Sequence, residues 1–236
     1  MEILKGIEIL SSCLLIKRKS LVISDLHMGY EEALNKHGVL IPRSQFKETE
    51  AKLNEIFKQT GKIETIIING DLKHEFSAIS EQEWSETLKV FDILQKHCKK
   101  IILVKGNHDT FLGPIAKKRG LEIKDYYCLE DICILHGEKI IQNLDVSKAK
   151  ILIIGHEHPA ISLREGMKQE TYKCFLFGTW KKQKLIVMPS FLPIIEGSDI
   201  KGGEILSPYL IQNLDNFEVF ILGDKVYKFG KLKNIQ

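Results

Sequence analysis

The chain reads Ile101-Ile-Leu-Val-Lys-Gly-Asn107-His-Asp109, an apolar, β-branched run that ends on an amide, an imidazole and a carboxylate. A run without polar alternation is typical of a strand that is buried on both faces. Four more apolar runs end on Asp or His in the same way, namely Ser20–His27, Thr65–Asp71, Ile132–His136 and Ile151–His158. Because the ligand site of an open α/β sheet lies beyond the carboxyl ends of its strands, we expect these ends to meet at one edge.

Between the strands, the apolar residues change to helical spacing. Helices are predicted over Arg43–Gln59, Ser80–Lys99 and Pro114–Arg119, and the second of them opens on a capping box formed by Ser80 and Glu83. The alternation of strand, helix and strand predicts a right-handed parallel crossover. In the last third of the chain, turn residues separate short apolar segments, which predict antiparallel strands that complete a second sheet.

Length and composition indicate one globular domain over residues 1–236. A net charge of +3 is too small to argue for nucleic acid by itself. No apolar stretch approaches the ~18 residues of a transmembrane helix, and the N-terminus lacks a secretory pattern, so we expect a cytoplasmic protein that does not enter a membrane. The cysteines form no Cys-x-x-Cys pair and are expected to be reduced, without a metal role: Cys13, Cys98, Cys128, Cys133 and Cys174.

The strand ends supply a set of residues that suits metal ions. The candidate ligands are Asp25, His27, Asp71, Asn107, His136, His156 and His158. Carboxylates and imidazoles without thiolate favour Mn, Fe, Zn, Co or Ni over a structural zinc–cysteine site. Seven ligands exceed what one ion takes, whereas two ions ~3.5–4 Å apart, bridged by a carboxylate, account for the number.

The alternative interpretation of each histidine is structural, because a lone buried histidine is more often a hydrogen-bonded core residue than a ligand. The pattern of the whole set argues against this alternative. Of the eight histidines, only His37 and His97 lie away from the strand ends and from the segment that follows Asp71.

The order Asp-x-His, Gly-Asp, Gly-Asn-His-Asp, His and Gly-His-x-His, between residues 25 and 158, resembles that of the calcineurin-like metallophosphoesterases. The resemblance implies an α/β fold, a two-sheet mixed β-sandwich flanked by helices in four layers. It implies that the first metal binds Asp25, His27, Asp71 and His158, and that the second binds Asp71, Asn107, His136 and His156. It also implies that His108 faces the scissile phosphate, with Asp109 as its neighbour.

The residue three positions after the bridging Asp relates the chain to one subgroup of the family. Many members of the family carry Asp three residues after the bridging Asp, whereas this chain has His74 there. Gly70-Asp-Leu-Lys-His74 is similar to the SbcD-type nucleases, the small archaeal SbcD-related phosphoesterases and the bacterial ligase-associated DNA-damage phosphoesterases. The segments Pro189–Pro193 and Gly197–Asp199 are similar to that subgroup too, and Phe191 either lines the substrate mouth or belongs to the core. The residues after His158 are needed to complete the sandwich, so we expect no separate DNA-binding cap.

These features predict hydrolysis of phosphodiesters by a water that two metals, with Mn favoured, bridge and acidify. His108 would protonate the leaving oxygen or stabilise charge, and His74 would steady His108 or the phosphate. The expected substrate is a phosphodiester, either in single-stranded or short nucleic acid during DNA repair or in a small molecule. Two alternatives stay open: a phosphatase or phosphodiesterase for a metabolite or cyclic nucleotide, and a metal-poor interaction scaffold. A homodimer is also left open.

Overall fold

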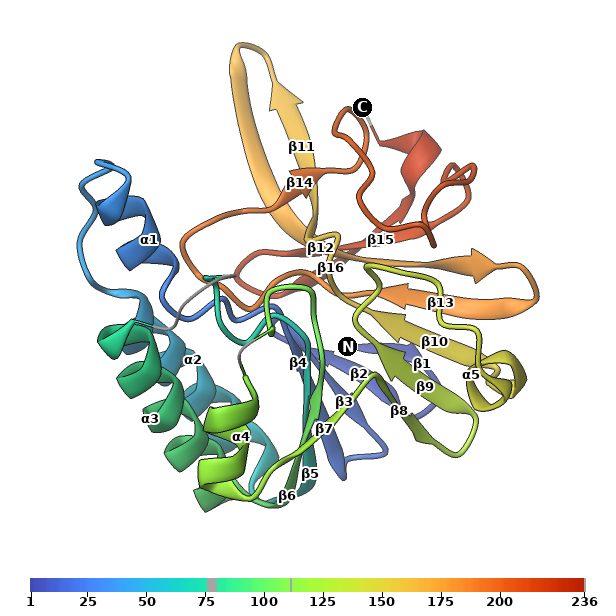
Figure 1. Ribbon diagram of the computed structural model, residues 1–236. Helices are drawn as coiled ribbons and strands as arrows, with labels where there is room; N and C mark the ends of the chain where they lie inside the picture. The colour runs from blue at the N-terminus through green and yellow to red at the C-terminus, as the bar shows by residue number, and fades with distance from the viewer. Residues whose placement is uncertain (76–79, 111, 236) are drawn as a thin grey trace.

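The computed structural model describes residues 1–75, 80–110 and 112–235. Two β-sheets pack face to face in this part of the chain (Figure 1). The first sheet has the order β1-β2-β3-β4-β5-β6-β7. Its strands are β1 (Glu2–Leu4), β2 (Ile7–Leu10), β3 (Cys13–Ile16), β4 (Ser20–Ser24), β5 (Ile63–Asn69), β6 (Cys98–Val104) and β7 (Glu122–Lys124). The ladder is antiparallel as far as β4 and parallel from β4 to β7, as the crossovers require.

The second sheet has the order β14-β11-β12-β13-β10-β9-β8, with β15 paired to β12 and β16 to β15. Its strands are β8 (Tyr126–Leu129), β9 (Ile132–Leu135), β10 (Ile151–Ile154), β11 (Pro159–Glu165), β12 (Lys168–Trp180), β13 (Gln183–Val187), β14 (Ser198–Asp199), β15 (Glu218–Leu222) and β16 (Val226–Lys231). Strands β9, β10 and β13 run parallel, whereas β12 pairs antiparallel with β11, β13 and β15. The predicted two-sheet mixed sandwich is confirmed.

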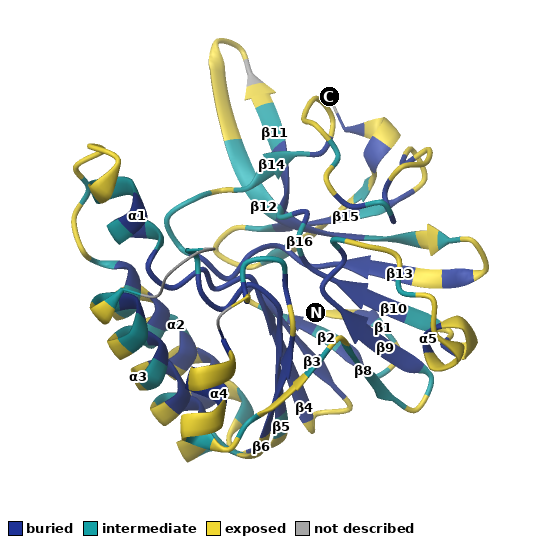
Figure 2. Ribbon diagram, viewed as in Figure 1, coloured by how far each residue is buried: buried dark blue, intermediate teal, exposed yellow. Residues whose placement is uncertain are grey.

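Alternating residues of the first sheet fill two separate cores. Val22, Ile67 and Ile102 are neighbours in register and pack between the sheets. Leu21 and Ile23, on the other face of β4, pack against the helices. Each central strand is therefore buried on both faces (Figure 2), which is why its sequence shows an unbroken apolar run.

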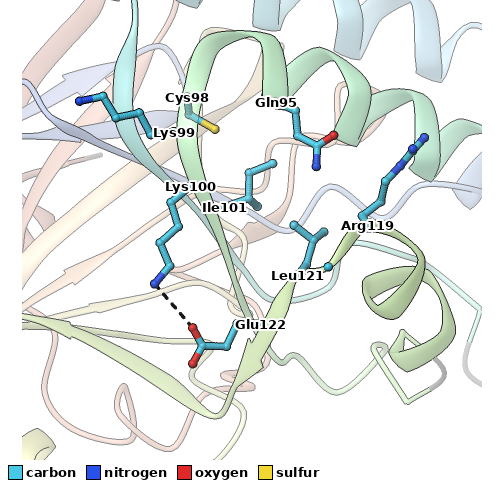
Figure 3. A pocket seen from close by; sticks show the side chains of 9 residues that line it. Gln95, Cys98, Lys99, Lys100, Ile101, Arg119, Leu121 and Glu122 are labelled. Carbon is cyan, nitrogen blue, oxygen red and sulfur yellow. Dashed lines mark ion pairs between the residues drawn. The ribbon is translucent and has the colours of Figure 1, made fainter.

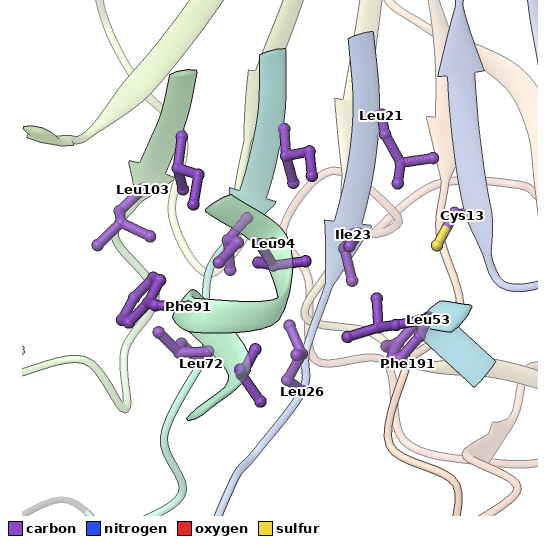
Figure 4. Packing of buried hydrophobic residues seen from close by; sticks show 14 of the residues in the cluster. Cys13, Leu21, Ile23, Leu26, Leu53, Leu72, Phe91, Leu94, Leu103 and Phe191 are labelled. Carbon is purple, nitrogen blue, oxygen red and sulfur yellow. The ribbon is translucent and has the colours of Figure 1, made fainter. Parts of the chain in front are cut away.

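Three helices cover the outer face of the first sheet: α2 (Gln45–Thr60), α3 (Glu81–His97) and α4 (Gly113–Arg119). Figure 4 shows Leu53, Phe91 and Leu94 against the strand residues Leu21 and Leu103. The outer face of the second sheet carries the short helix α5 (Leu144–Lys148), the 3-10 turn η1 (Leu232–Asn234) and an irregular segment that includes Tyr209 and Leu214. The fourth layer is therefore mostly irregular chain. No helix in the described ranges is long and apolar enough to span a membrane.

The helix bounds differ slightly from those predicted. The second predicted helix ends at His97, because Cys98–Lys100 already pair with β5. Helix α1 (Tyr30–Lys36) was not predicted; it is short and begins after Gly29, whose φ of 89° only glycine adopts freely.

The prediction of reduced cysteines is wrong at two positions, because Cys128 and Cys133 form a disulfide. These residues are directly opposite in the β8–β9 hairpin, with Cα atoms 4.1 Å apart. The pairing therefore depends on the strand register, which residue spacing did not suggest. Cys13, Cys98 and Cys174 are free thiols.

Candidate metal centre

The carboxyl ends of five strands converge where the two sheets meet. Strands β4, β5 and β6 of the first sheet lead into three of the polar segments, and β9 and β10 of the second lead into the other two. The structure thereby brings together all the ligand candidates, which are Asp25, His27, Asp71, Asn107, His136, His156 and His158. The parallel pairing within each sheet places these ends side by side, as the rule for α/β sheets predicts.

Five of these residues adopt a left-handed backbone conformation. Their φ values are 55° for Asp25, 46° for His27, 48° for Asp71, 66° for His156 and 49° for His158. Such conformations cost on the order of 1–3 kcal/mol each in a non-glycine residue and cluster at functional sites. Here they let the chain turn sharply as it leaves the strands.

The first group of ligand atoms belongs to Asp25, His27 and His158. The Nε2 atom of His158 lies 3.2 Å from Oδ1 of Asp25 and 3.4 Å from Nε2 of His27. Asp25 is fully buried, and it is fixed by the Ser24 hydroxyl at 2.5 Å and by the backbone N–H of His156. The carboxylate is therefore held rigidly beside two imidazoles.

The second group belongs to Asp71, His136 and His156, with Asn107 beside them. Nε2 of His136 lies 3.2 Å from Oδ2 of Asp71 and 3.1 Å from Oδ1 of Asn107. Nδ1 of His136 lies 3.2 Å from the carbonyl oxygen of Asn69, which suits donation from Nδ1–H and directs Nε2 toward the carboxylate of Asp71.

These contacts bring nitrogen and oxygen atoms that can bind a metal toward one another. The Nε2 atoms of His27 and His158 face each other, and Nε2 of His136 faces the Asp71 carboxylate and the Asn107 oxygen. A divalent cation satisfies several such atoms at once, and the donors are oxygen and nitrogen without sulfur. The residues present therefore fit divalent metal ions.

The charges at the site also favour a bound cation. Burial by itself raises the pKa of Asp25, but nearby imidazoles, led by His158, outweigh burial and hold that pKa well below its ordinary value. Burial lowers the pKa of His136, yet the hydrogen bond to Asp71 and the charge of Asp25 raise it to about 10. Burial and the charge of His158 lower the pKa of His27 to about 3. The site thus keeps a negative charge in its interior, which favours a bound cation.

The three residues predicted to be catalytic occupy different places. The Nδ1 atom of His108 is hydrogen-bonded to the backbone oxygen of His74, and its Nε2 lies 3.9 Å from Oδ2 of Asp71. The His74 ring lies beside the first ligand group, with its Nδ1 3.4 Å from Nδ1 of His27. Asp109 is buried and accepts hydrogen bonds from the N–H groups of residues 72 and 106, so it ties the ends of β5 and β6 together.

Two glycines of the sequence motifs allow close approaches to the ligands. A Cβ atom on Gly106 would lie 2.2 Å from Oδ1 of Asp71, and one on Gly155 would lie 2.0 Å from Oγ of Ser24. Both distances are far below van der Waals contact. The glycines of Gly-Asn-His and Gly-His-x-His are therefore required by packing against the site.

Several supporting residues were not found by sequence reasoning. Gln45 of α2 donates to the backbone oxygen of His27 at 2.8 Å, and Ser24 holds Asp25. Neither residue belongs to a recognisable motif. Phe191 is fully buried in the core beneath the helices, which decides between its two predicted roles in favour of the core.

A hollow of about 380 Å³ lies away from this centre, at the amino ends of β6 and β7 (Figure 3). Two of its charged side chains are paired with acidic residues, Lys100 with Glu122 at 3.6 Å and Arg119 with Asp92 at 2.6 Å.

The fold is similar to that of the Pseudomonas putida nuclease MPE, with a TM-score of 0.64, 18% identity and 94% of each chain covered. The vacuolar protein sorting 29 structure from Cryptosporidium parvum gives a TM-score of 0.40 at 17% identity, covering 90% of this chain and 97% of that one. A Streptococcus pneumoniae protein described as a predicted phosphoesterase gives 0.34 at 19% identity, with 88% and 91% covered. No curated protein sequence matches this chain. Residues 18–223 match the family model described as calcineurin-like phosphoesterase.

Proposed function

Because this chain belongs to the calcineurin-like phosphoesterase family, we propose that it is a metal-dependent phosphodiesterase. The proposed ligands of two divalent ions are Asp25, His27, Asp71 and His158 for the first and Asp71, Asn107, His136 and His156 for the second. The position of Asp71 carries this proposal, because its Oδ2 lies 3.7 Å from Nε2 of His27 and 3.2 Å from Nε2 of His136. One buried carboxylate is thus in reach of both ligand groups.

Two ions held here would supply Lewis acidity and a nucleophilic hydroxide near neutral pH, and Mn is the favoured ion. Asp25, His27, Asp71 and His136 are buried, whereas the ligands Asn107, His156 and His158 are half-buried. The side chain of His108 is also partly exposed, at 15%. A phosphate that approaches from solvent therefore meets His108 as it reaches the ligand groups.

His108 is proposed as the group that protonates the leaving oxygen or stabilises the charge on it. Its Nδ1–H is engaged by the His74 carbonyl, so its Nε2 is the ring nitrogen that faces Asp71 and the ligand groups. Proton donation of this kind contributes typically ~10²–10⁴-fold. Asp109 is proposed to support His108 through the backbone rather than to touch the substrate.

The proposed substrate is a phosphodiester in single-stranded or short nucleic acid. The Pseudomonas putida protein of similar fold is a nuclease, which supports this choice by analogy. A role in DNA repair and the absence of a separate cap domain stay predictions.

The test uses metal-stripped protein and two synthetic substrates, bis(p-nitrophenyl) phosphate and p-nitrophenyl phosphate. Mn, Zn, Ni and Mg are added back in turn, and Asp71→Asn serves as the control. Diester cleavage that needs metal and is lost in the variant would support the proposal and lead to single-stranded DNA. Cleavage of the monoester alone, or no metal-dependent cleavage of either substrate, would refute it.

A further inference from the structure

Glu83 lies in the first turn of α3, where the sequence predicted a capping box. Only half of that box forms: the Ser80 hydroxyl accepts from the Glu83 N–H at 3.0 Å. The Glu83 carboxylate instead leaves the helix, and its Oε1 accepts from the N–H groups of His74 at 2.8 Å and Glu75 at 3.1 Å. A side chain that usually serves its own helix is therefore directed at the segment after Asp71.

The segment after Asp71 is hydrogen-bonded to the imidazole of His108, the proposed catalytic residue. The backbone oxygen of His74 accepts the hydrogen bond from Nδ1–H of His108, and the His74 N–H is shared between Glu83 and the carbonyl oxygen of Met28, 3.0 Å away. A chain of hydrogen bonds thus runs from the Glu83 carboxylate through the backbone of His74 to the His108 ring, which is proposed to face the phosphate.

The surroundings of Glu83 are built to hold it in place. Its side chain is fully buried, and a Cβ atom on Gly29 would lie 3.0 Å from its Cβ and Cγ. The buried Lys73 ammonium donates to the Glu75 carbonyl and supplies a compensating positive charge. Burying a carboxylate is costly unless it is hydrogen-bonded and compensated. Oε1 meets the first condition, whereas Oε2 has no hydrogen-bond partner among the described residues, and burial outweighs the nearby charge and raises the pKa of Glu83.

We propose that Glu83 is a positioning residue for His108: it fixes the His74–Glu75 backbone and, through the His74 carbonyl, the tautomer and direction of the imidazole. The inference rests on the proposed function, since it gives His108 its task. Among the described residues, the hydrogen bonds of the Glu83 carboxylate go to backbone N–H groups and not to the side chain of a proposed metal ligand. A displacement of about 1 Å at a reacting group can cost on the order of 10²-fold in rate.

A double-mutant cycle tests this directly, because a residue that acts only through His108 has no effect once His108 is absent. Hydrolysis of bis(p-nitrophenyl) phosphate is measured for the wild type, Glu83→Ala, His108→Ala and the double variant. We expect Glu83→Ala to lower kcat by about 10- to 100-fold with KM within about twofold. In the His108→Ala background the same change should alter kcat by less than about threefold.

Two further variants complete the design. Glu83→Gln keeps an oxygen acceptor and should restore most of the lost rate. Glu81→Ala, which removes an exposed carboxylate from the same helical turn, should leave the rate unchanged. An equal loss of kcat in both backgrounds, or no loss in either, would overturn the inference.

A readout without turnover separates this inference from the proposed function. In protein labelled with ¹⁵N-histidine, the His108 ring should show a proton fixed on Nδ1, and Glu83→Ala should abolish that signal while Glu83→Gln retains it. If the wild type cleaved no diester but this pattern held, the proposed function would fail and the positioning would stand. An unchanged His108 signal in Glu83→Ala would refute the positioning itself.

Discussion

Replacing Lys173 by methionine should remove a pH-dependent part of the stability of this protein. Lys173 lies on β12, and its ammonium donates to the backbone oxygen and hydroxyl of Ser190, both at 2.9 Å, and to the backbone oxygen of Leu192. The N–H of Leu192 in turn donates to the backbone oxygen of Asp25 at 3.2 Å. The half-buried amino group of Lys173 is therefore connected, through Leu192, to the backbone of Asp25 in the first ligand group.

The magnitude follows from the pKa of Lys173. Burial, assisted by the charge of Lys52, lowers that pKa from 10.5 to about 7. Between these two values the unfolded chain keeps a proton that the folded protein has released, so the free energy of unfolding rises with pH. Linkage gives a rise of about 2 kcal/mol between pH 7 and pH 9 from this one group.

The assay is urea unfolding of the wild type and of Lys173→Met at pH 7, 8 and 9. The difference in free energy of unfolding, wild type minus variant, should grow by about 2 kcal/mol across that range. Lys168→Met, at an exposed position on the same strand, is the control and should show no such trend. A difference that stays constant with pH would refute the reasoning.

Two more variants test the site itself. His108→Ala should leave Mn binding nearly intact, by isothermal titration calorimetry, while turnover falls about 10²–10⁴-fold; a parallel loss of metal would mean that His108 is a ligand. Gly106→Ala should lower metal affinity at least about tenfold, since its Cβ would lie 2.2 Å from Oδ1 of Asp71. Unchanged metal content by mass spectrometry after dialysis would contradict that prediction.

Much of the fold was predictable because the central strands are buried on both faces. Because of that burial, a strand such as Thr65–Ile68 can be recognised from its apolar residues alone, without knowing which strands pair with it. The cover of the second sheet was not predictable in the same way, since it consists mainly of irregular segments without periodicity. The disulfide of Cys128 escaped prediction because it depends on strand register.

The candidate site shows the same division. The convergence of Asp25, Asp71 and His136 followed from one rule about strand ends, and the structure brings them together. The hydrogen bonds of the Glu83 carboxylate could not be predicted. The capping-box sequence is the same whether the carboxylate caps its own helix or accepts hydrogen bonds from another segment. Gln45 likewise reads as an ordinary residue of a helix start.

The proposed ligands are divided between the two sheets. Asp25, Asp71 and Asn107 follow strands of the first sheet, whereas His136 and His158 follow strands of the second. Ions bound between them would connect the two sheets, and the free energy of metal binding would stabilise the packing of one sheet against the other. Metal binding would then be thermodynamically linked to the packing of the two sheets against each other. A substitution between the sheets that weakens this packing would lower the metal affinity even where it contacts no ligand.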